Sequence, residues 1–181
     1  MDATRLVSVL THVILTHANE PIKPEKAFRK CDGKTPASIH PILCAMLLLH
    51  ETSLSEEIRE KGWETLASHD IFEDTGGALT QEATEEIIRL VTGMTFKNNV
   101  EEMERVWERG SEIILYKLYD KFSNLLQDSV LAEEKRPRYY EYILKLCEEV
   151  EKTYGELDIV TVARAIVRKR KIKEELIKNL V

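Results

Sequence analysis

Helical periodicity runs along nearly the whole chain and restricts its fold more than any other feature. Apolar residues recur at spacings of about three and four positions, as on the buried face of an α-helix. No stretch of useful length alternates between apolar and polar residues, and we find no internal repeat. We therefore predict an all-α fold whose helices cover residues 3–18, 39–51, 53–75, 80–94, 111–131, 136–154 and 158–180. Residues 21–36 form a basic connector in which Pro and Gly leave room for only a short helix.

The length of the chain limits how many domains it can form. Its 181 residues are enough for one compact domain with a substantial core and few for two. Apolar residues make up 43% and charged residues 32%, as is usual for soluble globular proteins. We expect a single domain over residues 1–181, closed by the C-terminal helix at 158–180.

Charge and hydropathy exclude some classes of partner. The net charge of −6 argues against a duplex-DNA surface reader, which needs a large basic footprint, so we expect no nucleic-acid partner. A phosphorylated small molecule needs only a local basic patch. No apolar stretch approaches the ~20 residues of a membrane span. Residues 1–18 lack a basic leading segment and a small-residue cleavage site, and His12 interrupts their apolar run. We therefore expect neither a membrane partner nor a signal peptide.

The cysteines indicate the cellular compartment of the protein. Cys31, Cys44 and Cys147 are odd in number and have no spacing typical of a metal site. Cys44 and Cys147 lie within apolar helical patterns, as reduced core thiols do. We expect a cytoplasmic protein, and the sequence leaves open whether it forms a homo-oligomer.

The stretch "LASHDIFEDTG", residues 66–76, places an imidazole and three carboxylates close together at the end of a predicted helix. These are His69, Asp70, Glu73 and Asp74, and no Lys or Arg occurs between Thr65 and Gln81. Like charges at such spacings repel, and the carboxyl end of a helix disfavours anions. Two interpretations stay open, namely a solvated acidic face and a site that binds a cation.

Two further polar residues lie in apolar helical segments. His40 precedes Pro41 at the start of 39–51, and Asp120 lies among apolar neighbours in 111–131. Singly, His40 could be a helix cap or a hydrogen-bonded core histidine, and Asp120 could pair with Lys117. Together with His69 and Asp70 they make two histidines and two aspartates from three helices. Such nitrogen and oxygen ligands suit a divalent metal ion.

The motifs resemble those of a known family. In order, "IHP", "HDIFEDT" and "LYDKFSNL" are similar to the H, HD and D motifs of the HD-domain metal-dependent phosphohydrolases. The Glu-Asp pair after HD and the D-x-x-x-N of the last motif resemble the hydrolase domain of RelA/SpoT proteins and their stand-alone relatives, the small alarmone hydrolases. The resemblance runs over about residues 27–146. It implies a single compact HD-domain helical bundle.

The resemblance also implies roles for individual residues. It implies a manganese ion, or another divalent metal, held by His40, His69, Asp70 and Asp120. It implies that Glu73 and Asp74 orient or deprotonate the attacking water. The residues implied to contact the substrate are Arg29, Lys30, Asn124, Arg138 and Tyr142. From the residues alone, the alternatives are that Arg29 and Lys30 are solvated loop cations and that Arg138 and Tyr142 are ordinary residues of a helix surface.

By this resemblance the chain is a hydrolase that removes pyrophosphate from the 3′ position of (p)ppGpp to give GDP or GTP. Three departures bear on the substrate pocket. "PASIHP" lacks the tyrosine usual before the first ligand, Leu126 stands where an arginine often follows the asparagine, and 92–112 is short. One alternative is therefore a phosphohydrolase for another phosphorylated nucleotide, such as a nucleotidase or an NADPH phosphatase. The other is a non-catalytic nucleotide-binding protein with an HD-like fold.

Overall fold

The computed structural model describes residues 2–127 and 131–178 of the protein. Helices are the main secondary structure in these ranges. The all-α prediction is confirmed, since only two isolated β-bridges accompany the helices in these ranges. In chain order the α-helices are α1 Ala3–Asn19, α2 Ile39–Leu49, α3 Glu56–Ser68, α4 Ile71–Asp74, α5 Glu85–Met94, α6 Asn99–Arg105, α7 Ser111–Leu125, α8 Arg136–Tyr154 and α9 Asp158–Lys178. Short 3₁₀ helices lie at η1 Pro24–Ala27, η2 Val106–Glu108 and η4 Glu133–Lys135.

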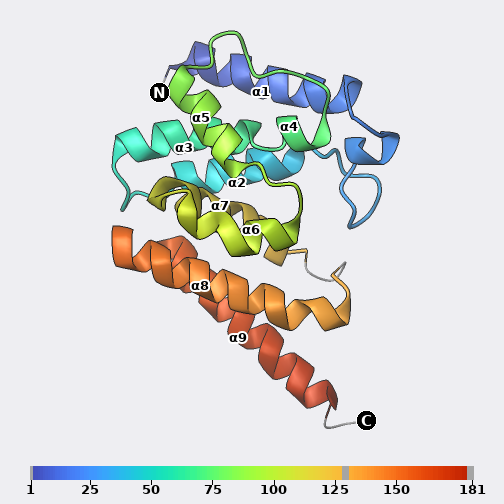
Figure 1. Ribbon diagram of the computed structural model, residues 1–181, viewed down its shortest axis with the longest axis vertical. Coiled ribbons are helices and arrows are strands. Elements are labelled where there is room, and N and C mark those ends of the chain that lie inside the picture. Colours follow the sequence, from blue (N-terminus) through green and yellow to red (C-terminus); the bar gives the residue numbers. More distant parts are fainter. Residues whose placement is uncertain (1, 128–130, 179–181) are drawn as a thin grey trace.

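The helices pack around α2, α3 and α7, which lie in the middle of the molecule (Figure 1). α2 packs on α3 and α7, while α1 and α5 cover α3 from the other side. α8 packs on α7, and α9 crosses α8 before its last turns extend away from the body (Figure 1). Large side chains fill the core between these layers, among them Leu48, Trp63, Leu66, Tyr116 and Leu118. This packing brings the start of α2, the end of α3 and the middle of α7 together.

Several helix ends follow from capping residues. Ser55 begins α3 by accepting a hydrogen bond from the Ile58 N–H, and two glutamates follow in the first turn. α8 covers the predicted range, with Pro137 in its first turn and Gly155 just after it. Gly155 has a φ of 79°, a conformation that glycine adopts without steric cost.

The predicted helix at 53–75 is divided in the structure. α3 ends at Ser68 and α4 begins at Ile71, so His69 and Asp70 lie between two helices. The Nδ1 atom of His69 lies 2.7 Å from the Leu66 carbonyl oxygen, a group that would otherwise accept a bond from the helical backbone. Glu73 and Asp74 therefore lie in the short helix α4 rather than in α3.

Two other predicted boundaries need correction. α5 begins at Glu85 rather than near residue 80, because Thr84 caps it by accepting from the Ile87 N–H. α6 was not predicted, although Asn98 caps it by accepting from the N–H groups of Val100 and Glu101. Asn98 followed by acidic residues is the local signal that could have located α6.

Parts of two predicted helices lie outside the described residues. α7 ends at Leu125, and residues 128–130 of the predicted range 111–131 fall outside the description, as do 179–180 of 158–180. Within the described ranges, none of the helices has the length and apolar character needed to cross a membrane. Cys44 and Cys147 are buried free thiols, as expected.

Candidate metal centre

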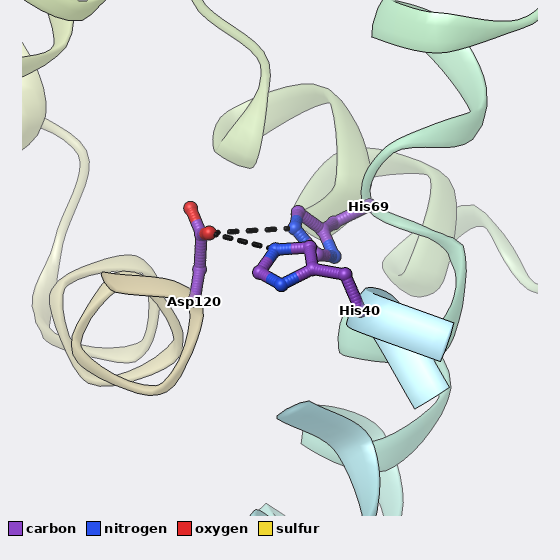
Figure 2. A group of neighbouring side chains, drawn as sticks. All are labelled: His40, His69 and Asp120. Carbon is purple, nitrogen blue, oxygen red and sulfur yellow. Dashed lines mark hydrogen bonds and ion pairs between the residues drawn. The ribbon is translucent and has the colours of Figure 1, made fainter. Parts of the chain in front are cut away.

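The four side chains predicted as metal ligands converge on one place. His40 comes from the start of α2, His69 and Asp70 from the junction of α3 and α4, and Asp120 from α7. Figure 2 shows His40, His69 and Asp120 pointing toward one another. One ligand atom each from His40, His69 and Asp120 lies within 4.8 Å of the others, an arrangement that could hold a metal ion. Asp70 places Oδ1 3.1 Å from Nε2 of His69 and Oδ2 3.9 Å from Nε2 of His40.

The orientation of His69 is compatible with a cation bound at its Nε2. Because Nδ1 lies 2.7 Å from the Leu66 carbonyl oxygen, which can only accept, Nδ1 carries a proton. The lone pair of buried Nε2 then faces the carboxylates of Asp70 and Asp120, at 3.1 and 3.8 Å. Burial lowers the pKa of His69, but the charges of Asp70 and Asp120 outweigh burial and raise the pKa to about 9. Either a proton or a metal ion satisfies this arrangement, and the donor set fits a divalent metal.

His40 is fixed from both sides of its ring. Nε2 lies 3.1 Å from Oδ1 of Asp120, and Nδ1 lies 2.9 Å from the buried hydroxyl of Ser123. Both partners lie on α7, so α7 determines the orientation of the ring. Such partners behind a ligand are typical of metal sites.

Two lysines hold the outer oxygen of Asp120. Its Oδ2 lies 3.2 Å from Nζ of Lys117 and 3.1 Å from Nζ of Lys121, and Glu102 pairs with the same lysines at 3.0 and 2.9 Å. All four residues are buried. Burial opposes ionisation, but the positive charges of Lys121 and Lys117 hold the pKa of Asp120 well below its usual range. Asp120 is therefore a carboxylate whose inner Oδ1 faces the histidines.

The sequence interpretation that no cation balances the acidic turn needs correction. Lys26 of η1 forms an ion pair with Asp74. The cation that pairs with the acidic turn comes from a segment far away in the sequence, and the fold places it beside Asp74. The carboxylates of Asp120 and Glu102 share Lys117 and Lys121, whereas Asp70 faces the rings of His69 and His40. Among the described residues no lysine or arginine forms an ion pair with Asp70, so a divalent cation would supply positive charge there.

The two predicted water-activating residues lie in different environments. Glu73 accepts a hydrogen bond from the Phe96 N–H at 3.1 Å, and burial raises its pKa. Asp74 is bound to Lys26. Glu73 therefore has a raised pKa and no ion-paired lysine among the described residues, whereas Asp74 is paired with Lys26.

Two of the predicted substrate residues lie next to the centre. Asn124 donates from Nδ2 to Oδ1 of Asp120 at 3.0 Å and accepts on Oδ1 from Nη2 of Arg29, also at 3.0 Å. Gln127, which was not predicted, also accepts from Arg29. Hydrogen bonds thus connect Arg29 to a candidate ligand through one side chain.

For the other three predicted substrate residues, the structure shows no direct hydrogen bond to a candidate metal ligand among the described residues. Lys30 and Arg138 have exposed side chains. Tyr142 is buried in α8, and its hydroxyl donates to Glu102 at 3.1 Å. Tyr142 therefore reaches Asp120 only through Glu102 and its lysines.

His17 is a buried histidine near the centre that sequence analysis missed. It lies on α1, it is 2% exposed, and neither ring nitrogen has a hydrogen-bond partner among the residues that the structure describes. The charges of Asp70 and Asp74 act on it, and the end of α1 is bound to the acidic turn by the Gly76 N–H, which donates to the Glu20 carbonyl. No local pattern in the sequence distinguishes His17 from His12, whose ring instead contacts the Ala78 carbonyl oxygen.

Comparison with known proteins identifies the fold. Neither the family models nor the curated protein sequences contain a match to this chain. A solved structure described as "A metazoan ortholog of SpoT hydrolyzes ppGpp and plays a role in starvation responses" matches 94% of this chain and 97% of its own, with a TM-score of 0.70. The chain shares the fold of that SpoT ortholog. At 20% sequence identity the likeness extends to the all-α HD-domain fold expected from the motifs, and chemistry must be argued from the residues.

Proposed function

We propose that the protein is a metal-dependent phosphohydrolase that releases pyrophosphate from the 3′ position of (p)ppGpp. The observation that supports this most is the convergence of His40, His69 and Asp120, with Asp70 placed against both imidazole rings. The shared fold with a SpoT ortholog described as hydrolysing ppGpp supports the same class of reaction. The proposed ion is Mn²⁺, a metal that accepts imidazole and carboxylate ligands.

The residues of the site have different proposed roles in hydrolysis. His40, His69, Asp70 and Asp120 would hold the divalent ion, which lowers the pKa of a bound water and stabilises charge on phosphoryl oxygens. Glu73 takes the proton of the attacking water, because burial has raised its pKa towards the working pH. Asp74, fixed by Lys26, orients this water. Neither Glu73 nor Asp74 is needed as a ligand.

The substrate is expected to bind on the side of Arg29 and Asn124. Arg29 and Lys30 would contact its phosphates, and Asn124 would connect the substrate contacts to Asp120. Arg138 would reach the substrate from the exposed face of α8. Tyr142 would contribute through Glu102, because its hydroxyl is already engaged.

Two observations favour a second candidate, a phosphohydrolase acting on another phosphorylated nucleotide. Leu126 is 46% exposed where related hydrolases often have an arginine, and Tyr142 is buried. Both differences reduce the contacts available to a substrate with phosphates at two ribose positions. They leave the metal chemistry unaffected.

A nucleotide panel tests the proposal. Mn²⁺-loaded protein is incubated with ppGpp, pppGpp, NADPH and nucleoside monophosphates, and the products are identified by chromatography and mass spectrometry. We expect GDP or GTP together with pyrophosphate. Hydrolysis of NADPH or a monophosphate with ppGpp untouched would replace the substrate but keep the class. Binding of ppGpp without turnover would instead support a nucleotide-binding protein.

A further inference from the structure

The guanidinium group of Arg29 is held by two side-chain amides. Nη2 donates to Oδ1 of Asn124 at 3.0 Å and to Oε1 of Gln127 at 3.0 Å, and Nε donates to Oε1 of Gln127 at 3.3 Å. Asn124 lies in the last turn of α7 and Gln127 follows its end. Two neighbouring residues thus fix the group in one plane.

Amide oxygens hold an arginine without removing its charge. A carboxylate in the position of either amide would form an ion pair and neutralise the guanidinium. In residues 2–127 and 131–178, no carboxylate lies within ion-pair distance of Arg29. An arginine stays protonated at any working pH, and no described carboxylate neutralises the charge of this one.

The three hydrogen bonds leave part of the guanidinium open. Arginine has five N–H donors in a fixed fork. One on Nε and two on Nη2 are used, and no described acceptor binds the two on Nη1. The side chain is only partly buried. The two free N–H groups of Nη1 can each donate to a phosphate oxygen, and the fixed positive charge favours a phosphoryl group there.

We propose that Gln127 is a positioning residue which, together with Asn124, holds Arg29 as an un-neutralised cation for a phosphate of the substrate. The chemical class of ligand is a phosphate or pyrophosphate group bound beside the metal centre, and this part rests on the proposed function. Asn124 couples the two sites, since its amide also donates to Asp120. Holding Arg29 in place before the substrate arrives reduces the entropy lost on binding.

The substitution Gln127→Glu tests this directly, because it keeps the shape of the side chain and adds a charge. The new carboxylate pairs with Arg29, so we expect KM for ppGpp to rise about tenfold while kcat changes little. Thermal stability should stay equal or increase, since an ion pair replaces a neutral contact. A merely structural role of Gln127 would instead lower stability and leave KM unchanged. The matched control is Gln81→Glu, which adds the same charge at an exposed position before α5 and should leave KM unaltered.

Binding of inorganic pyrophosphate to Mn²⁺-loaded protein, measured by calorimetry, separates this inference from the proposed function. Gln127→Glu should weaken pyrophosphate binding about tenfold, and Gln127→Met, which removes the contact without adding charge, should weaken it less. Equal binding by wild type and Gln127→Glu, or equal weakening in Gln81→Glu, would overturn the inference. If wild type does not hydrolyse ppGpp but Gln127→Glu still loses pyrophosphate, the proposed substrate fails and the role of Gln127 stands.

Discussion

Lys26 forms an ion pair with Asp74, and this contact distinguishes Asp74 from the adjacent Glu73. η1, which carries Lys26, lies far from the acidic turn in sequence. A backbone hydrogen bond joins the same two segments, since the Ile22 N–H donates to the Asp74 carbonyl at 3.1 Å. Glu73 instead accepts from the Phe96 N–H, and burial raises its pKa. The two acidic residues therefore have different surroundings and should have different roles.

Single substitutions separate these roles. Glu73→Gln should keep the metal and lower kcat about 10²–10⁴-fold, the contribution of a positioned general base. Asp74→Asn should lower kcat less, and should lower the melting temperature because Lys26 loses its partner. Steady-state kinetics, metal analysis and thermal denaturation measure the three quantities. A larger loss of kcat in Asp74→Asn than in Glu73→Gln would show that the roles are reversed.

The buried charges behind Asp120 should control metal affinity. Removing one partner of a buried ion pair costs about 3–5 kcal/mol, so both Lys117→Met and Glu102→Gln should destabilise the fold. Their effects on metal binding should have opposite signs. Lys117→Met removes a positive charge next to Asp120 and should tighten metal binding. Glu102→Gln removes a negative charge near the same site and should weaken metal binding.

The measurement is a metal titration alongside chemical denaturation for each variant. Lys152→Met is a suitable control, because Lys152 pairs with Glu148 and Glu149 on the exposed face of α8. It should change neither quantity by much. Metal affinities that change in the same direction in Lys117→Met and Glu102→Gln would exclude a charge effect.

His17 should make stability depend on pH in the acidic range. Burial lowers its pKa below the ordinary value of 6.5, so the unfolded chain binds a proton more readily than the folded protein does. The contribution of His17 is therefore complete above pH 6.5 and is lost as the pH falls through its folded-state pKa.

The variant His17→Phe isolates this contribution. Its free energy of unfolding should decrease less than that of wild type between pH 7 and pH 5, because phenylalanine does not bind a proton. Urea denaturation at several pH values provides the measurement, with His12→Gln, a substitution on the same helix, as the control. Parallel pH profiles for His17→Phe and wild type would mean that His17 is not held neutral in the folded protein.

The helices could be predicted from the sequence because their signals are local. The predicted range 136–154 coincides with α8, which ends before Gly155, and the helix predicted from residue 53 contains α3, which begins after Ser55. α6 was missed because it is short, and only Asn98 marks its start. The division at His69 and Asp70 could not be predicted, since it depends on a side-chain contact with the Leu66 carbonyl.

The site could be predicted only in part, for a similar reason. The motifs contain His40, His69, Asp70 and Asp120, and the fold brings all four together. The charges that surround them come from distant segments, with Glu102 on α6 and Lys26 on η1. Gln127 follows the last motif, but nothing in its sequence indicates a contact with Arg29. Contacts between distant segments depend on how the helices pack, and a local sequence pattern does not predict this packing.

The metal content of the protein tests the central claim most directly. Wild type, the double variant Asp70→Asn/Asp120→Asn and the control Asp74→Asn are loaded with Mn²⁺, dialysed and analysed by inductively coupled plasma mass spectrometry. We expect about one ion per chain in wild type and in Asp74→Asn, with a lower melting temperature after chelation because a bound ion stabilises the folded state. The double variant should retain no ion and no hydrolase activity. Full metal occupancy in the double variant would contradict the assignment of these four side chains as the metal centre.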